Sequence, residues 1–340
     1  MFRSMISRRA CLLAMAGALA AGTMLQAPAV RAQEALPAKP EAGAFKLGIE
    51  PWLGYGLWHV AAKKDLFAKE GLSDVEIVNF TEDKDLNAAL ASGQLDAATI
   101  ATHTAMGMVQ AGLPVKIVML LDFSLSADAI LAGKDIKSIA DLKGKEVAFE
   151  EGTTSDILLN YALSSNGMTI DDIVRVPMPA ADAGTALIAG RVPVAVTYEP
   201  YISSARAQDP NVSLLFTAGV DPGLVSDVLI VRDEVLKEKP GQVVAMLKAW
   251  DAALADYRKN TAEDRAIIAE AVGAKPEELT TAFYGVQYYS VGEAAAAFKG
   301  DFSGKTFGDV LAAAKKAGLV KKDITPESVI DPAFAAAAAK

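Results

Sequence analysis

The sequence contains one helix–glycine–strand pattern twice, once in each half of the chain. Residues 85–105 read DLNAALASGQLDAATIATHTA, and residues 182–202 read DAGTALIAGRVPVAVTYEPYI. In each segment, apolar residues at helical spacing stop at a glycine, and a short apolar strand and a polar tip follow. Gly93 and Gly190 hold equivalent positions, where glycine takes the left-handed turn that ends a helix. The chain therefore contains two similar α/β units, which arose by duplication or by convergence on a common unit.

Strands and helices are expected to alternate along both units. Short β-branched or apolar runs alternate with amphipathic stretches from Phe45 onward, as in sheets of mostly parallel strands flanked by helices. We expect strands at 45–50, 75–80, 96–101, 115–121, 146–150, 173–178, 194–198 and 212–216. We expect helices at 56–72, 85–92, 155–167 and 182–190.

Two extended segments, 127–133 and 225–232, lead out of the first unit and back into it. Further helices are expected at 240–260, 262–273 and 308–320. We predict one discontinuous lobe from residues 45–131 plus 228–335 and a second lobe from residues 132–227. Two crossover strands would join them at a hinge, because a few residues at strand ends can absorb the rotation of one lobe against the other. The tail from Asp331 lacks an apolar face with helical period, so we expect it to fray.

The first 32 residues have the features of an export signal. A basic start with Arg8 and Arg9 is followed by an apolar alanine and leucine run and by small residues before Ala32. We expect cleavage after Ala32, and the arginine pair suits the twin-arginine route as well as the general secretory route. A membrane anchor is the alternative, but the apolar run is short and broken by glycines.

Charge and cysteine content exclude several classes of function. The signal contains four arginines and no acid, so the remaining chain has 33 − 4 = 29 basic and 42 acidic residues, a net charge of −13. Such a chain repels nucleic acid and anionic membranes, and no Lys/Arg stripe offsets this repulsion. The single cysteine, Cys11, lies in the signal, so we expect no disulfide, thiol chemistry or thiolate metal site.

Polar tips follow the expected strands in both units. In an open α/β sheet the ligand crevice lies beyond the carboxyl ends of the strands, where helix N-termini expose unpaired N–H groups. The tips at 50–56, 81, 102–104 and 122–128 belong to the first unit, and those at 150–156, near 179 and at 197–201 belong to the second. We expect the two sets to face one cleft.

Four segments, in this order, resemble one known family. They are LGIEPWLGYGLWHVAAKKDLFAKEGL, ALASGQLDAATIA, SIADLKGKEVAFEEGTTSDILL and VAVTYEPY, together with the strands that connect them. The chain resembles the periplasmic solute-binding proteins of ABC importers for nitrate, sulfonates and taurine over most of its length. The resemblance implies a two-lobed type II binding-protein fold, which closes on a small molecule in the periplasm and presents it to a permease with a cytoplasmic ATPase.

Residue types at the tips suggest how a ligand is held. Gly152, Thr153 and Thr154 begin a helix, whose N–H groups and dipole favour an anionic group; plain N-capping is the alternative. The aromatic residues at the tips can line an apolar wall or bind a cation over their ring faces. Gly54 permits close backbone approach, and His59 lies within a helix and is expected to be structural.

Acidic residues crowd the tips without an arginine to neutralise a bare carboxylate or sulfonate. Glu50, Asp122 and Glu151 are among them, but we favour Asp128 and Glu199 as ligand contacts, with hydrogen-bond acceptors or hinge ion pairs as the alternative. A zwitterion such as an aminosulfonate would place its amine on these acids and its acid group near Thr153. The expected ligand-binding residues are Trp52, Gly54, Tyr55, Thr81, Thr102, His103, Phe123, Ser124, Asp128, Glu150, Gly152, Thr153, Thr154, Tyr198 and Glu199.

We therefore expect a monomeric binding protein for a sulfonate or an aminosulfonate such as taurine. A pyrimidine or thiamine precursor, or another nitrogenous cation, is the alternative ligand, and a related pyrimidine-forming enzyme is the alternative function. No nucleophile elbow, phosphate loop, dinucleotide fingerprint or metal motif occurs in the sequence. We expect no catalysis, cofactor or metal, since two dispersed histidines without a mature cysteine make a poor transition-metal site.

Overall fold

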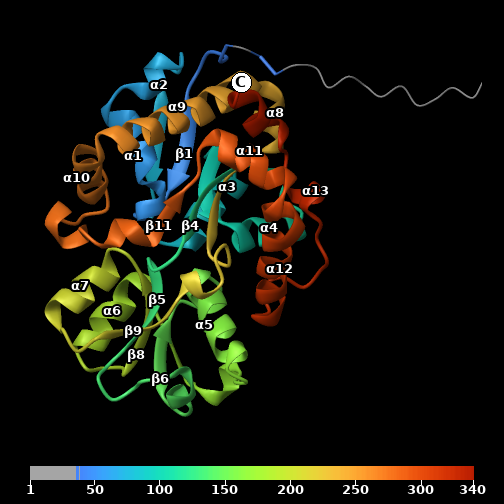
Figure 1. Ribbon diagram of the computed structural model, residues 1–340. Helices are drawn as coiled ribbons and strands as arrows, with labels where there is room; N and C mark the ends of the chain where they lie inside the picture. Colours follow the sequence, from blue (N-terminus) through green and yellow to red (C-terminus); the bar gives the residue numbers. More distant parts are fainter. Residues whose placement is uncertain (1–35, 38) are drawn as a thin grey trace, which may run out of the picture. The chain divides into compact units, whose positions relative to one another are not determined.

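Two separate β-sheets form the centre of the structure, and each is covered by helices (Figure 1). The structure is a computed structural model that describes residues 36, 37 and 39–340. The expected export signal and its cleavage site lie outside these residues. We call the six-stranded sheet with its helices lobe 1 and the five-stranded sheet with its helices lobe 2.

The sheet of lobe 1 has the strand order β11-β4-β10-β3-β1-β2. Strand β1 pairs in parallel with β2 and β3, whereas β10 is antiparallel to β3 and β4, and β11 is antiparallel to β4. The strands span Phe45–Ile49 (β1), Val75–Asn79 (β2), Ala97–Ala101 (β3), Val115–Ser124 (β4), Ser226–Arg232 (β10) and Val286–Tyr288 (β11).

The sheet of lobe 2 has the strand order β7-β6-β8-β5-β9. Strand β6 is parallel to β7 and β8, and β5 is antiparallel to β8 and β9. The strands span Asp128–Ala132 (β5), Glu146–Phe149 (β6), Val174–Pro177 (β7), Val194–Tyr198 (β8) and Ser213–Thr217 (β9). Both sheets are thus mixed rather than mostly parallel, because a strand that enters a sheet directly from the other lobe needs no crossover helix and can run against its neighbours.

Helices cover the sheets on both lobes. Lobe 2 carries α5 (Thr154–Ser165), α6 (Ala180–Ile188) and α7 (Tyr201–Gln208). The helices of lobe 1 are α1 (Gly56–Lys63), α2 (Leu66–Lys69), α3 (Asp83–Ala91), α4 (Thr102–Gln110), α8 (Asp233–Glu238), α9 (Pro240–Lys259), α10 (Thr261–Ala271), α11 (Val291–Lys299), α12 (Phe307–Lys316), α13 (Pro326–Val329) and α14 (Ala333–Ala338). Trp58 of α1 and Trp250 of α9 are fully buried with ring centroids 4.8 Å apart, so this pair joins two helices of the lobe 1 core.

The chain passes between the lobes at two places. Residues 125–127 link β4 to β5, and residues 218–225 link β9 to β10. The carbonyl oxygen of Gly285 accepts hydrogen bonds from the amides of Leu125 at 2.7 Å and Ser126 at 3.3 Å, so the first link is held against lobe 1. The lobe boundary expected between residues 131 and 132 falls inside β5, which pairs entirely within the sheet of lobe 2.

The lobes also contact each other away from these links. The α7 helix of lobe 2 packs against the 3-10 helix Pro276–Leu279 of lobe 1, and α5 of lobe 2 packs against α12 of lobe 1. The two contacts lie on different helices of lobe 2. The conformation described is therefore one in which the lobes touch.

Two local expectations from the sequence were wrong. The helix expected at 56–72 is divided into α1 and α2, because Asp65 takes a left-handed conformation with φ 55° that interrupts helical bonding. The tail does not fray: α14 packs against α9 and α11, with Phe334 3% exposed and Ala335 fully buried. Alanine favours the helix strongly enough that one buried aromatic anchors the segment.

Candidate functional site

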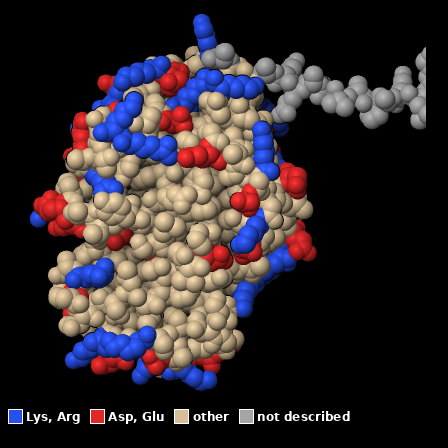
Figure 2. All heavy atoms as spheres, viewed as in Figure 1, with Lys and Arg blue, Asp and Glu red and all other residues tan. Residues whose placement is uncertain are grey.

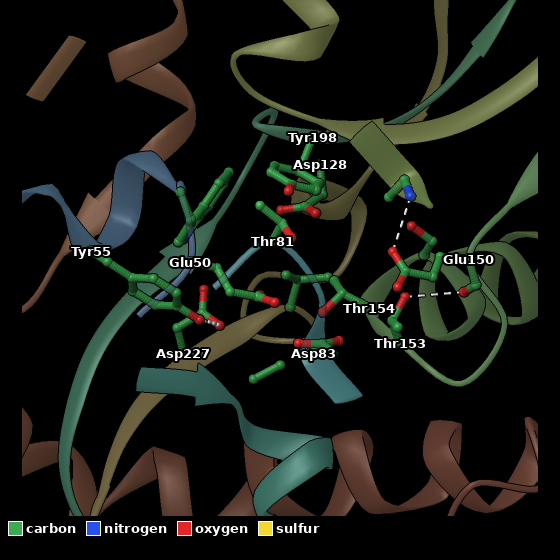
Figure 3. A pocket seen from close by; sticks show the side chains of 15 residues that line it. Glu50, Tyr55, Thr81, Asp83, Asp128, Glu150, Thr153, Thr154, Tyr198 and Asp227 are labelled. Carbon is green, nitrogen blue, oxygen red and sulfur yellow. Dashed lines mark hydrogen bonds between the residues drawn. The ribbon is translucent and has the colours of Figure 1, made fainter. Parts of the chain in front are cut away.

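A pocket lies where the strand ends and helix starts of the two lobes meet (Figure 3). It contains about 60 Å³ of space in which the centre of a water molecule fits, and about 600 Å³ of unfilled space when its open mouth is counted. This size suits a small molecule rather than a polymer. The lining residues are Glu50, Trp52, Tyr55, Thr81, Asp83, Ala101, Asp128, Glu150, Thr153, Thr154, Ser155, Ala180, Tyr198, Val225 and Asp227.

Local structure explains why these side chains converge. Glu50 and Trp52 directly follow β1, and Asp83 begins α3 after β2 ends. Asp128 and Asp227 lie at or next to the first residue of β5 and β10, the strands that enter each sheet from the opposite lobe. Glu150 and the start of α5 follow β6, and Tyr198 ends β8. The pocket is thus formed by the crossover points and by strand ends, as expected for an open α/β fold.

Five carboxyl groups and no Lys, Arg or His side chain line the pocket within the described residues. Burial raises the pKa of Asp128 to about 7, and the charges of Asp227 and Glu199 add to the shift. Burial likewise raises the pKa of Asp227 to about 6, although the Tyr55 hydroxyl donates a 3.0 Å hydrogen bond to its carboxylate. These carboxyl groups resist ionisation because the pocket removes them from water without supplying a positive charge.

The remaining acids of the pocket behave in the same way. Burial, reinforced by the neighbouring Asp83, raises the pKa of Glu50 to about 10. Burial raises the pKa of Asp83 and of Glu150 as well, and the Glu150 carboxylate accepts a 3.0 Å hydrogen bond from the Ala180 amide. A positively charged ligand would relieve this desolvation and repulsion together.

A further carboxylate stands directly behind the pocket. Asp122 is opposite Asp227 in the pairing of β4 and β10, and its side chain is fully buried with neither oxygen hydrogen-bonded in the described chain. Burial and the charge of Asp227 raise the pKa of Asp122. Gly54 lies against it: a Cβ at Gly54 would be 2.3 Å from Asp122 Oδ2 and 2.1 Å from Trp52 Nε1. Gly54 therefore makes room for these side chains rather than for a ligand.

An aromatic corner closes one side of the pocket. Trp52 of lobe 1 and Tyr198 of lobe 2 meet edge to face, with ring centroids 5.9 Å apart and an interplanar angle of 79°. Tyr201 extends the corner by packing on Tyr198 at 5.2 Å. Because one ring comes from each lobe, a flat or apolar ligand group held here would contact both lobes.

The start of α5 also faces the pocket. Thr153, Thr154 and Ser155 line it, and the N–H groups of a first helical turn have no partner within the helix. The Thr153 hydroxyl donates to the Glu150 carbonyl at 3.0 Å, and the Gly152 amide donates to the Asp156 carboxylate at 3.0 Å. The Gly152 amide is therefore occupied by a protein carboxylate.

The structure brings together only part of the expected site. Of the expected residues, those in the lining are Trp52, Tyr55, Thr81, Asp128, Glu150, Thr153, Thr154 and Tyr198. Those outside the lining are Gly54, Thr102, His103, Phe123, Ser124, Gly152 and Glu199. These seven residues do not line the pocket in the conformation described.

Each residue outside the lining has another place in the structure. Glu199 accepts hydrogen bonds from the amide and hydroxyl of Ser203, both at 2.9 Å, at the start of α7. The Thr102 hydroxyl bonds with Ser226, at 2.8 Å to the hydroxyl and 3.0 Å to the carbonyl. Phe123 packs on Tyr289, with ring centroids 4.9 Å apart.

His103 and Ser124 are buried outside the lining, and the Ser124 side chain contacts the pocket residue Asp128. Burial lowers the pKa of His103 to about 4, so its ring is neutral near pH 7. His59, expected to be structural, lies in α1, and burial lowers its pKa as well.

Sequence reasoning missed Asp83 and Asp227 as pocket residues and weighed Glu50 only as one of several acids. Asp83 follows the recognised tip at Thr81 and begins α3, so its position after an expected strand was an available signal. Asp227 lies inside a segment recognised only as a crossover strand. Within the described residues, no group of three or more His, Cys, Asp or Glu side chains has the arrangement of a metal site.

Sequence comparison places the chain in a family. The model of the family described as NMT1/THI5 like matches residues 56–263. The chain belongs to the NMT1/THI5-like family. A binding protein of Brucella abortus is 30% identical over 212 residues, which cover 62% of this chain and 65% of that relative, so the chain matches just under two thirds of the relative's length.

A second relative and a solved structure extend the comparison. The riboflavin-binding protein RibY of Chloroflexus aurantiacus is 30% identical over 245 residues, which cover 70% of this chain and 67% of that protein. The alkanesulfonate-binding protein SsuA of Xanthomonas axonopodis, solved with MOPS, has a TM-score of 0.69 at 19% identity and covers 85% of this chain and 98% of SsuA. The two-lobed α/β fold of this NMT1/THI5-like chain is thus that of periplasmic binding proteins.

Surface charge and helix length add two observations. Figure 2 shows Lys and Arg side chains at the two ends and along the edges of the face in view, interspersed with Asp and Glu, and the centre of that face is largely uncharged. A continuous basic stripe is therefore not seen on this face. Among the described residues, no helix combines the length and the hydropathy needed to cross a membrane.

Proposed function

We propose that this NMT1/THI5-like chain is the solute-binding component of an ABC importer. In this proposal it is exported to the periplasm, holds a small molecule in the pocket between lobes 1 and 2, and passes it to a permease with a cytoplasmic ATPase. Support comes from the fold and from the curated relatives, which are named as binding proteins. A ligand that touches both lobes favours the closed arrangement and shifts the population toward it.

We propose further that the ligand is a small organic cation with basic nitrogen. The observation that carries this choice is the lining itself, which contains Glu50, Asp83, Asp128, Glu150 and Asp227 and no basic side chain. A bare sulfonate or nitrate would enter a field of carboxylates and find no Arg or Lys to pair with. The aromatic corner supports the same ligand class, because ring faces attract cations.

An aminosulfonate such as taurine is the second candidate. The observation that favours it is the start of α5, whose first-turn amides at Thr154 and Ser155 can donate hydrogen bonds to an acid group while the Asp128 carboxylate accepts them from the amine. The Glu150 carboxylate lies at the same end of the pocket and would repel the sulfonate group, which counts against this candidate. Neither the riboflavin named for RibY nor the MOPS in SsuA decides between the candidates, because one family serves different ligands.

A thermal-shift screen tests this proposal directly. Primary and quaternary ammonium compounds and protonated aminopyrimidines form one arm, and ethanesulfonate, nitrate and taurine form the other. At about a hundredfold the dissociation constant a ligand raises the free energy of unfolding by about 2.7 kcal/mol. We expect stabilisation only by compounds with a basic nitrogen, and a shift with ethanesulfonate but none with any amine would refute the choice of cation.

A second measurement tests the absence of catalysis. We propose that the protein binds its ligand without changing it, so mass spectrometry of a stabilising compound after incubation with the protein should return the compound intact. Conversion of the compound at a rate proportional to protein concentration would instead identify an enzyme, since paired acids in a cleft can also do acid–base work.

A further inference from the structure

The carboxylates of the pocket belong to both lobes. Glu50, Asp83 and Asp227 come from lobe 1, whereas Asp128 and Glu150 come from lobe 2. In Figure 3, Asp227 and Glu150 lie at opposite sides of the pocket, with Glu50, Asp83 and Asp128 between them. The carboxyl groups are therefore spread along the pocket and are not gathered at a single point.

Among the lining residues of the described chain, no Lys, Arg or His side chain gives these carboxyl groups a positive partner. Asp128 is only 8% exposed and points into the pocket, where a hydrogen bond from the Ser124 side chain offsets part of the rise that burial causes in its pKa. Glu150 accepts one bond, from the Ala180 amide. The charge of Lys84 lowers the pKa of Glu150 slightly, but the Lys84 side chain is 74% exposed and pairs with Glu82 at 2.5 Å. Acceptors for a ligand's N–H groups thus remain at both ends.

One ammonium group cannot serve both ends. An ammonium has three donors, each of which needs an acceptor within about 3 Å, so it satisfies carboxylates around a single point. A ligand with one charge would leave the carboxyl group at the other end desolvated and without a positive partner, and burial without a counter-charge makes its ionised form costly. Two positive groups at separate positions on one ligand remove this cost.

Resting on the proposed function, we propose that the ligand is an organic dication, with one basic nitrogen near Asp128 and Asp227 and a second near Glu150. The Trp52–Tyr198 corner lies beside these acids in the lining and packs against the chain or ring that joins the two nitrogens. Asp128 and Glu150 belong to lobe 2 and Asp227 belongs to lobe 1. The dication therefore forms ion pairs with both lobes in addition to its packing contacts.

Calorimetric titration of the full mature chain near neutral pH tests the dication. The probes are the diamines from 1,3-diaminopropane to 1,6-diaminohexane, each beside the monoamine of equal carbon number. We expect one diamine length to bind about 10- to 100-fold more tightly than its monoamine, the gain of a charged hydrogen-bonded contact. Equal affinity for diamines and monoamines would overturn the dication and leave the cationic ligand standing.

Variants locate the second nitrogen. Glu150→Gln should reduce diamine affinity to that of the monoamine and leave the monoamine unaffected. Glu151→Gln is the matched control, because the adjacent Glu151 is exposed, pairs with Arg175 and lies outside the lining. Equal effects of the two substitutions would overturn the assignment, as would undiminished diamine binding in Glu150→Gln.

A second variant keeps the test decisive if Glu150→Gln folds poorly. Asp128→Asn should weaken diamine and monoamine alike, since both place a nitrogen there. Glu199→Gln, which lies outside the lining, should weaken neither. If no amine binds to the folded wild-type chain the dication is refuted, and the cation–anion screen then decides separately whether the proposed function fails too.

Discussion

The free energy of unfolding of the ligand-free protein should fall as pH rises, and Asp128→Asn should remove part of this fall. The pKa of Asp128 is raised from an ordinary 3.8 to about 7, so the folded chain holds a proton that the unfolded chain releases. Stability from this group is present in full below the unfolded pKa and is lost as pH rises through the folded value. The difference between these two pKa values corresponds to about 4 kcal/mol in the free energy of unfolding.

The measurement is urea unfolding of ligand-free wild type and Asp128→Asn, followed by tryptophan fluorescence across about pH 4 to pH 8. Near pH 4 both side chains are neutral and the difference in the free energy of unfolding reflects only local hydrogen bonding. Between pH 4 and pH 8 the wild type should lose up to about 4 kcal/mol more free energy of unfolding than the variant does. Titrating groups that do not interact with Asp128 contribute equally to both proteins and cancel, whereas the charges of Asp227 and Glu199 act on Asp128 and are part of the measured difference.

The control is Glu151→Gln, where the wild-type carboxylate is exposed and faces Arg175. Its difference from wild type should be small across the same range, because charges in water cost little. A pH-independent difference for Asp128→Asn, or a variant that loses stability against wild type as pH rises, would refute the reasoning that burial without a cation raises this pKa.

Three further changes test the packing of lobe 1 by the same unfolding assay. Lys64→Met should cost about 3–5 kcal/mol, because it leaves the fully buried Asp264 carboxylate without its ion-pair partner; a cost under about 1 kcal/mol would contradict this. Phe334→Ala should also cost about 3–5 kcal/mol, whereas no change would mean that the tail frays after all. Gly285→Ala would bring a Cβ to 2.8 Å from the Ala127 amide nitrogen and should cost about 1–3 kcal/mol, and a neutral result would show that the link between lobes yields freely.

The strands were the most predictable part of the fold. The strand expected at 194–198 coincides with β8, and that expected at 96–101 differs from β3 by one residue. Both are short apolar runs whose residues are almost entirely buried, so the hydrophobic pattern alone defines them. The three-residue β11 was not predicted, because a strand at a sheet edge needs no apolar run of its own.

The site was predictable as a place but not as a set of side chains. Tips after the strands do surround the pocket, because the fold class determines where strand ends meet. Choosing between neighbours at a tip requires side-chain directions, which alternate at a strand end: Tyr198 faces the pocket, whereas Glu199 turns away to Ser203. Asp227 was missed because its burial depends on residues of β4, of β3 and of the 3-10 helix Leu53–Tyr55, which only tertiary folding brings together.

The two links between the lobes start from adjacent strands, since β4 and β10 are hydrogen-bonded neighbours along most of their length. Two links that start side by side act as one hinge, so the lobes have one dominant axis of rotation relative to each other. A pair of spectroscopic labels, one on an exposed position of each sheet's outer helices, would then follow the whole opening movement as one distance.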